Sequence, residues 1–234
     1  MTVTFIHHSS FLIELSSCYL LFDFYQGKLP ELDPDKPLYI FASHSHYDHF
    51  DRCVFRLGEA GQKVQWILSD DILKKFVPVQ ARPSTVFLKP HRTFADERIR
   101  VETLRSTDLG VAFWVTVTEE DGDTTVYHAG DLNDWYWDGD EDDLALEQRY
   151  LRELERIRGR HADVAFVPVD PRLQQHGYLG LYYFLHYVTA DVVFPMHFWK
   201  KYDYIPKVKQ RPELSPWRDQ IREPRYEGEM FPLF

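Results

Sequence analysis

The stretch His-Ser-His-Tyr-Asp-His, which begins at His44, holds the densest group of metal-binding side chains in the sequence. It directly follows the apolar run 38–42, which has the composition of a buried strand. On extended backbone, side chains two residues apart point the same way, so His44 and His46 can bind one ion together. Asp48 and His49 follow past a bend and can bind a second ion close to the first. Imidazole and carboxylate ligands suit zinc, iron and other first-row metals.

The spacing His-x-His-x-Asp-His after an apolar strand resembles the signature of the metallo-β-lactamase superfamily. Residues 4–14, Thr-Phe-Ile-His-His-Ser-Ser-Phe-Leu-Ile-Glu, look like the N-terminal pattern of its metal-dependent hydrolases related to ascorbate-6-phosphate lactonase. Residues 127–131 (Tyr-His-Ala-Gly-Asp) and 195–198 (Pro-Met-His-Phe) look like later motifs of that branch. The resemblance covers most of the chain and implies a mixed α/β (α+β) fold, a four-layer αββα sandwich. It indicates the superfamily much more strongly than the substrate.

Two further ligands follow from the resemblance. Asp131 comes at the end of the predicted strand 124–128, where this fold needs a carboxylate that bridges two ions. His197 comes at the end of the predicted strand 190–196 and completes the ligands of the second ion. The expected metal ligands are therefore His44, His46, Asp48, His49, Asp131 and His197.

One motif of the resembled family is missing. A third metal-binding histidine is expected between the predicted strands that begin at Ile99 and Val111, yet residues 104–110 contain no histidine. Either Asp108 or a hydroxyl group replaces it, or the first ion has fewer ligands. An oxygen ligand would shift the preference towards manganese, iron or magnesium, and one ion could bind only weakly. We expect a divalent metal, with two ions and zinc as the first choice, and with manganese or iron as alternatives.

Three side chains are expected close to these ligands. His8 matches the histidine of the N-terminal motif, so it is placed near the site as a substrate contact or a supporting group, and with Asp48 as a catalytic candidate. A surface histidine in a turn is the alternative for His8. Asp23 ends a predicted strand, where it either orients a ligand histidine or forms a turn. His128 lies three residues before Asp131 on the same strand, so the two side chains point to opposite faces. We therefore interpret His128 as a core or ligand-orienting histidine that does not bind the metal.

Candidate substrate contacts follow the later motifs. Trp135 and Trp137 could form a wall of the pocket, although burial in the core is an equal alternative. Asp170 and Arg172 follow the predicted strand 162–169, and Arg172 is a candidate anion contact. Lys200 could hold a substrate anion, although a solvent-facing lysine is the ordinary alternative.

The composition supports a single domain, 1–234, because 234 residues with 44% hydrophobic content can form one large core. A net charge of −10 argues against a nucleic acid partner, which would require a basic face. It does not argue against a small anionic substrate, because bound ions supply positive charge. Only two cysteines occur, without paired spacing, and there is neither a signal-peptide pattern nor an apolar run of membrane-spanning length. We therefore expect a cytoplasmic protein with a small-molecule substrate, without a membrane partner. Members of the resembled family often form homo-oligomers.

Hydrophobic periodicity predicts the remaining elements. Short strands in a meander are expected within residues 2–24, followed by a short helix capped by Asp51 and a strand at 64–68. A further helix, capped by Ser69, Asp70 and Asp71, is expected to stop before Pro78. Further strands and helices are expected at 99–103, 111–117, 144–157 and 178–187. Charged, proline-containing residues beyond Tyr204 are expected to form a helix and an extended segment.

Together these patterns predict a metal-dependent hydrolase in which a metal-bound hydroxide attacks an ester, lactone, thioester or phosphodiester of a small molecule. The residues do not distinguish among these bonds. An iron-dependent redox enzyme on the same scaffold is the main alternative, since an oxygen-rich first site would suit iron. A nuclease is a further alternative, against which the net charge argues. A metal-binding module without catalytic activity is the remaining one.

Overall fold

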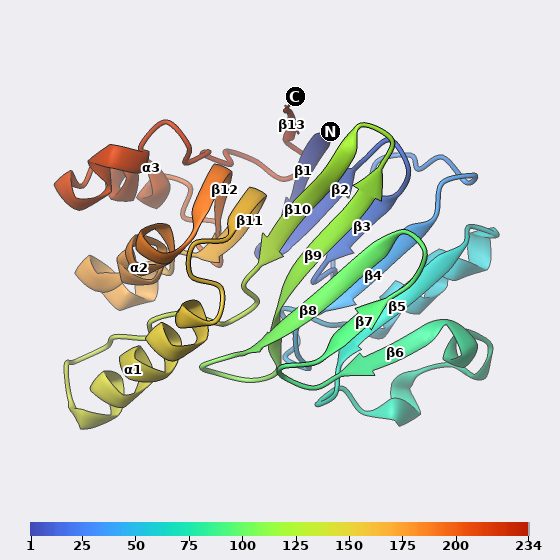
Figure 1. The fold of residues 1–234 in the computed structure, drawn as a ribbon, viewed down its shortest axis with the longest axis horizontal. Coiled ribbons are helices and arrows are strands. Elements are labelled where there is room, and N and C mark those ends of the chain that lie inside the picture. Colours follow the sequence, from blue (N-terminus) through green and yellow to red (C-terminus); the bar gives the residue numbers. More distant parts are fainter. Residues whose placement is uncertain (234) are drawn as a thin grey trace. The chain divides into compact units, whose positions relative to one another are not determined.

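The computed structural model describes the backbone of residues 1–233, and their side chains apart from those of residues 58–60. The chain forms two compact units, one made of Met1–Lys89 with Arg225–Phe234, the other of Pro90–Pro224. Each unit contains one sheet (Figure 1). The prediction of one domain over residues 1–234 stays a prediction. Within the described residues, none of the helices combines the length and the apolar composition that crossing a membrane requires.

The first unit contains a seven-stranded sheet with the order β13-β1-β2-β3-β4-β5-β6. Its strands are β1 (Thr2–His7), β2 (Ser10–Glu14), β3 (Tyr19–Phe22), β4 (Leu38–Ala42), β5 (Val64–Ser69), β6 (Thr85–Leu88) and β13 (Met230–Pro232). Strands β1 to β3 form the predicted antiparallel meander, and β3 to β6 run parallel. All five residues of β4 are buried, which explains its continuous apolar sequence. The predictions for 38–42 and 64–68 are confirmed.

Short 3₁₀ helices complete the first unit: η1 (Arg52–Ala60), η2 (Lys74–Phe76) and η3 (Val79–Ser84). As predicted, the Asp51 side chain caps η1, here by accepting a hydrogen bond from the backbone N–H of Cys53. The predicted helix from Ser69 is wrong, because only the three-residue η2 forms before Pro78. Proline disfavours helical backbone in the residue before it, and Val77 is accordingly extended.

The second unit contains a six-stranded sheet with the order β12-β11-β10-β9-β8-β7. Its strands are β7 (Thr93–Ala95), β8 (Ile99–Arg105), β9 (Val111–Glu119), β10 (Gly122–His128), β11 (His161–Pro168) and β12 (Thr189–Met196). Neighbours from β7 to β10 pair antiparallel, whereas β10, β11 and β12 run parallel. The parallel strands therefore end at one edge of the sheet, which is where polar loops collect in such folds. The three-residue β7 was not predicted.

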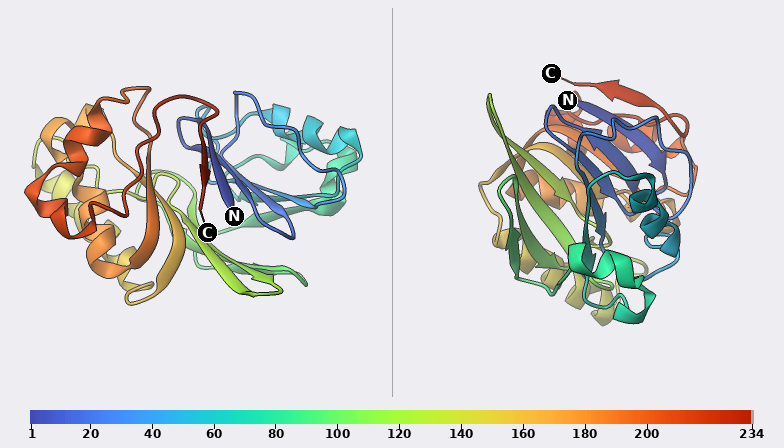
Figure 2. Two further views of the ribbon diagram at one scale, coloured as in Figure 1. Left: turned by 90° about the horizontal axis from the view of Figure 1, so that it is seen from above. Right: turned by 90° about the vertical axis from the view of Figure 1, so that its right-hand side faces the viewer.

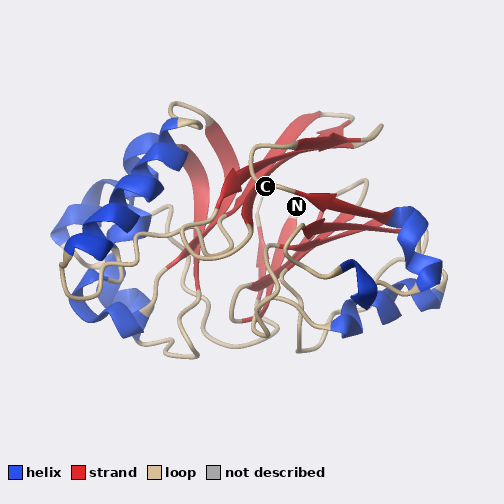
Figure 3. Cartoon of the chain, turned by 90° about the horizontal axis from the view of Figure 1, so that it is seen from below, coloured by secondary structure: helices blue, strands red, loops and turns tan. Residues whose placement is uncertain are grey.

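Helices of the second unit are α1 (Glu141–Glu155), α2 (Leu179–Tyr187) and α3 (Tyr204–Lys209), with the 3₁₀ helices η4 (Pro171–His176) and η5 (Pro212–Trp217). Helix α2 packs against β11 and β12, and α1 packs against α2 (Figure 1). Figure 3 distinguishes the helices, in blue, from the strands, in red. Asp140 caps α1 by accepting hydrogen bonds from two backbone N–H groups of the first turn. The predicted helices at 144–157 and 178–187 are confirmed, each within three residues at its ends.

Both ends of the described chain belong to the first unit. Strand β13 pairs antiparallel with β1, with Pro232 opposite Thr2, so the two chain ends lie side by side (Figure 2). The extended segment predicted for the C-terminal part thus becomes the edge strand of the first sheet.

Candidate metal centre

The first unit presents its histidines on the loop after β4. The side chains of His44 and His49 are fully buried, whereas His46 is exposed. Ring centroids are 4.6 Å apart between His44 and His46, and 4.1 Å apart between His44 and His49. His44 and His46 each offer a ring nitrogen within 4.8 Å of the other, a spacing at which one ion can bind both.

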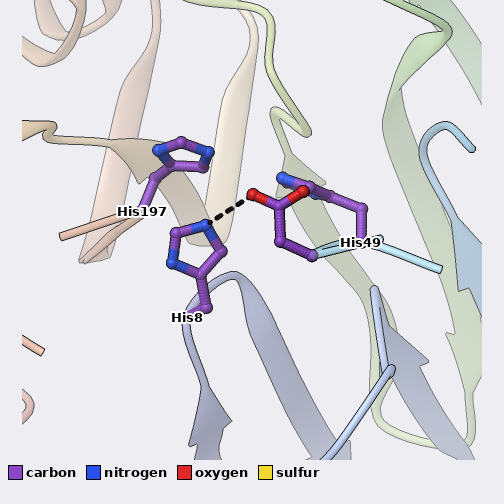
Figure 4. Close-up of side chains that lie close together, drawn as sticks. His8, His49 and His197 are labelled. Atoms are coloured by element: carbon purple, nitrogen blue, oxygen red, sulfur yellow. Dashed lines mark ion pairs between the residues drawn. The ribbon is translucent and has the colours of Figure 1, made fainter. Parts of the chain in front are cut away.

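A second group in this unit contains His8, Asp48 and His49, whose ligand atoms lie within 4.8 Å of one another. The Nε2 atom of His8 is 3.5 Å from Oδ2 of Asp48 (Figure 4). His8 occupies the turn between β1 and β2 with a φ of 53°, a left-handed conformation that is costly for a non-glycine residue. The sequence placed His8 near the loop from its motif alone, and the fold of the first unit brings it there.

Asp23 organises this loop from a fully buried position at the end of β3. Its carboxylate accepts hydrogen bonds from the backbone N–H and the hydroxyl of Ser43, both at 2.7 Å, and from Nδ1 of His49 at 2.7 Å. The Ser43 hydroxyl in turn lies 2.9 Å from Nδ1 of His44. Such contacts fix the Nδ1 side of both rings and leave each Nε2 atom as the ligand nitrogen. The sequence suggested Asp23 but missed Ser43, since a serine in a loop carries no specific signal.

Asp71 supports the same loop from the segment after β5. Its Oδ2 atom accepts a hydrogen bond of 2.8 Å from the backbone N–H of Ser45, the residue between two histidines. The sequence assigned Asp71 to a helix cap, so this contact was missed. Only the parallel pairing of β4 with β5 brings the two loops together.

Burial raises the pKa of Asp48, but the hydrogen bond from His8 and the charge of His49 act in the opposite direction. The net effect holds the pKa of Asp48 well below its ordinary value. Asp48 is therefore a carboxylate at neutral pH, able to bind an ion or accept a proton.

In the second unit, Asp131 stands between two other candidate ligands. It follows β10 beside Gly130, whose φ of 51° gives the corner its left-handed backbone. The Nε2 atom of His197 is 3.5 Å from Oδ1 of Asp131, and a carboxylate oxygen of Asp108 lies within 4.8 Å of one from Asp131. This arrangement suits a carboxylate shared by two ions.

His197 is oriented by a buried carboxylate, as His49 is. Its Nδ1 atom lies 2.9 Å from Oδ2 of Asp170, which is fully buried. Arg172 forms a two-pronged ion pair with the same carboxylate, at 2.6 Å from Nη2 and 2.9 Å from Nε. Burial raises the pKa of Asp170, but the bonds from His197 and Arg172 outweigh it and lower that pKa to about 2. Asp170 therefore stays ionised and holds His197 in one tautomer.

The segment without a histidine, residues 104–110, still supports the centre. The Thr107 hydroxyl donates to the backbone oxygens of Asp131 at 3.2 Å and Asn133 at 2.6 Å. Asp108 is exposed at the tip of this segment, where its N–H donates to Ser106 Oγ. Thr107 was missed, because its partners are distant in sequence.

The aromatic candidates differ in exposure. Trp135 is buried, donates to the backbone oxygen of Asp131 at 3.1 Å, and meets the His197 ring edge-on at 5.6 Å. Trp137 is 46% exposed, and the Arg172 guanidinium lies over its ring at 5.8 Å. Lys200 is exposed and has a φ of 59°. Among the candidate substrate contacts of the second unit, Trp137, Arg172 and Lys200 are thus the ones that solvent reaches.

His128 is fully buried, packs against Phe166 with ring centroids 5.7 Å apart, and accepts a hydrogen bond from the N–H of Gly130. Its contacts are those of a core histidine that shapes the corner before Asp131.

Comparison with known protein families separates this architecture from other mixed α/β folds. The model of the β-lactamase superfamily domain matches residues 2–197. The chain belongs to the metallo-β-lactamase superfamily. The predicted fold class is thereby confirmed, whereas the branch of ascorbate-6-phosphate lactonase is not. This fold implies binding of a divalent metal, and the histidines and aspartates described above are its candidate ligands.

Several solved structures share this fold at low sequence identity. Igni18, a metallo hydrolase from the archaeon Ignicoccus hospitalis, is 16% identical with a TM-score of 0.62 over 100% of this chain and 99% of its own. Isothiocyanate hydrolase from Delia radicum gut bacteria is 12% identical with a TM-score of 0.59, over 100% and 99%. CmlA, a diiron β-hydroxylase from Streptomyces venezuelae, is 10% identical with a TM-score of 0.57, over 84% and 44%. No curated protein sequence matches the chain.

Proposed function

We propose that this protein is a metal-dependent hydrolase whose histidine and aspartate side chains bind two divalent ions. One observation carries the proposal: each unit offers its ligands in two adjacent groups. In the first unit the groups meet at His44 and His49, with ring centroids 4.1 Å apart. In the second they meet at Asp131, which has Asp108 on one side and His197 on the other.

The side chains fit such ions. Imidazole nitrogens and carboxylate oxygens are the ligands that zinc and related metals prefer, and buried carboxylates fix the rings of His49 and His197. When bound, the ions would supply an activated water and stabilise the charge that develops on the substrate. The proposed ligands are His44, His46, Asp48, His49, Asp108, Asp131 and His197. Zinc is the first choice, and the oxygen-rich Asp108–Asp131 pair keeps manganese and iron as alternatives.

The protein groups have separate tasks in this proposal. Asp23 and Asp170 hold the histidine tautomers, and His8 moves a proton at Nε2, next to the ionised Asp48. The exposed ring of Trp137, with Arg172 stacked on it, offers a surface for a small substrate that combines an apolar part with an anionic group. Asp170, which the sequence suggested as a substrate contact, is fully buried, so its task here is to orient His197.

The bond that is cleaved is an ester, lactone, thioester or phosphodiester. The chain's negative charge supports a small molecule over a nucleic acid as substrate. An iron-dependent redox enzyme is the second candidate, because the Asp108–Asp131 pair would make one ion position rich in oxygen ligands.

Metal content tests the proposal directly. We would measure metals by elemental mass spectrometry in the protein purified without added metal, and in His49→Ala, His197→Ala and His186→Ala. His186 is exposed and bonds to its own helix backbone, so its variant is the control. We expect about two equivalents in the wild type and the control, and about one fewer in each of the other variants, since each loses a ligand of the same ion.

A His197→Ala protein that keeps its full metal content would contradict the proposed role of His197 as a metal ligand. Ester, lactone, thioester and phosphodiester panels then identify the bond. Iron as the main metal, together with oxygen consumption, would replace the hydrolase by the redox enzyme.

A further inference from the structure

Two adjacent polar side chains in the second unit, Asn133 and Asp134, are buried without protein partners. Each residue is only 1% exposed. Both carboxylate oxygens of Asp134 and both terminal atoms of the Asn133 amide lack a hydrogen-bond partner among the described residues. Buried polar groups are almost always satisfied, and a carboxylate without a donor is the most costly exception. Four unsatisfied atoms on neighbouring residues therefore indicate that something other than this chain satisfies them.

The charges around Asp134 show what kind of group is needed. Burial, together with the negative charges of Glu147 and Asp143, raises the pKa of Asp134 to about 7. Among the described residues, the charged groups that act most on Asp134 are these two carboxylates. The surroundings thus combine a high negative potential with the low solvation of a protein interior.

Two hydroxyl contacts between α1 and α2 lie near Asp134. The Tyr183 hydroxyl on α2 donates to Oε1 of Glu147 on α1 at 2.6 Å, and Asp134 raises the pKa of Tyr183. The Tyr150 hydroxyl on α1 donates to the backbone oxygen of Gly180 at 2.7 Å. Both contacts join α1 to α2, and the loop with Asp134 lies against them.

Gly180 fixes the position of the Asn133 amide. A Cβ atom at Gly180 would lie 1.7 Å from Oδ1 of Asn133 and 3.3 Å from the backbone nitrogen of Asp134. Only glycine therefore leaves room for this side chain, which places its carbonyl oxygen beside α2 and the Asp134 backbone. A carboxylate and an amide oxygen from neighbouring residues are the hard ligands that Ca²⁺ and similar cations prefer.

We propose that Asn133 and Asp134, together with the charge of Glu147, form a second cation site that binds a hard cation such as Ca²⁺ through oxygen ligands. A cation satisfies the carboxylate and the amide oxygen at once, and it balances the neighbouring negative charges. A proton on Asp134 would serve one oxygen only. The cation would tie the loop after Asp131 to α1 and α2, and so hold that metal ligand in place.

Terbium luminescence tests the site, because Tb³⁺ replaces Ca²⁺ and is excited through nearby tyrosines such as Tyr150 and Tyr183. The experiment uses the protein loaded with its catalytic metal, and compares the wild type with Asp134→Asn and Glu155→Gln. Glu155 is an exposed glutamate on α1, the helix that also carries Glu147, so its variant is the control. We expect saturable luminescence that Ca²⁺ displaces, an affinity at least about tenfold lower in Asp134→Asn, and no change in the control.

Two further measurements separate the alternatives. Binding that weakens about tenfold or more from pH 8 to pH 5.5 in the wild type would support the site, since protons compete for Asp134. His197→Ala should keep its terbium signal, because the ligands proposed here are not those of the catalytic metals. Potassium that stabilises the wild type but not Asp134→Asn would also support a hard-cation site, with a monovalent ion. A signal that is absent, or equal in the wild type and Asp134→Asn, would mean that water or a proton satisfies these groups, and would overturn the proposal.

Discussion

The two units offer metal ligands in different ways. The candidate ligands of the first unit are mostly nitrogen atoms from one loop after β4, and His8 of the preceding hairpin lies beside them. The second unit supplies mostly carboxylates, from three loops that follow β8, β10 and β12. A single buried carboxylate, Asp23, reaches Ser43 and His49 in the first unit, whereas Asp170 orients only His197 among the candidate ligands.

This difference shows two routes to a metal centre. In the first unit, local spacing alone sets which side chains meet, because the ligands lie within six residues of one another. In the second unit, the order of the strands does so, because β10, β11 and β12 run parallel and end at one edge. The effects of substitutions in the first unit can therefore be compared with the effects of matching substitutions in the second unit.

Removal of a proposed ligand should have the largest effect. We expect His46→Ala and Asp108→Ala each to lower the metal content by about one equivalent, since both belong to the first ion position. Elemental mass spectrometry measures this loss. If Asp108→Ala keeps the metal content of the wild type while His46→Ala does not, Asp108 does not replace the missing histidine.

Substitution of a carboxylate that orients a histidine should have the next largest effect on metal binding. Asp23→Asn should weaken metal binding by on the order of 100-fold, because Asp23 fixes His49 directly and His44 through Ser43. Asp170→Asn should weaken it by on the order of tenfold, because it fixes only His197. Competition with a chelator measures both affinities. Equal losses in the two variants would show that one carboxylate does not orient more ligands than the other.

Buried carboxylates of the two units should respond to pH in opposite directions. The pKa of Asp134, raised to about 7, exceeds the unfolded value, so the folded protein binds a proton more tightly there. In protein without metal or other cations, protonation of Asp134 contributes up to about 4 kcal/mol to the free energy of unfolding. This contribution is complete below about pH 4 and is lost as the pH rises through about 7.

Denaturant unfolding between pH 4 and pH 8 measures the slope of the free energy of unfolding against pH. Asp134→Asn should flatten it, whereas Asp140→Asn, on the exposed start of α1, should leave it unchanged. In contrast, the pKa of Asp48 is lowered, so its contribution is present at neutral pH and is lost in acid. A slope that persists in Asp134→Asn would place the responsible group elsewhere.

The smallest effect is expected for Asp71, which holds only the backbone of the histidine loop. Asp71→Ala removes the acceptor of the Ser45 N–H and should weaken metal binding by about tenfold or less. Asp71→Asn retains an oxygen acceptor and should recover most of that loss. Asp70→Ala is the matched control, since its side chain is exposed. Chelator competition that gives equal affinities for Asp70→Ala and Asp71→Ala would show that this contact does not support the loop.

Sequence reasoning performed best where ligands are close together in the chain. The loop after β4 could be assigned from its spacing, and its strand has the predicted bounds. Asp131 and His197 needed a family motif, because nothing local to a lone aspartate or histidine after a strand distinguishes a metal ligand from a turn residue.

The supporting contacts could not be predicted, for a physical reason. Ser43, Asp71 and Thr107 act through single hydrogen bonds to partners that only the folded sheets bring near. The left-handed backbone of His197 could not be predicted from the sequence either, because a histidine does not prefer that conformation. The predicted helix after Ser69 failed because proline preferences outweigh an apolar pattern over so few residues.

The pairing of β1 with β13 has a consequence for synthesis of the chain. The first unit is built from residues that precede the second unit in the chain and from residues that follow it. While the ribosome works through residues 90–224, β1 therefore presents an uncovered strand edge with open N–H and C=O groups. The last strand closes that edge, so the histidine loop belongs to an incomplete sheet until translation reaches Met230.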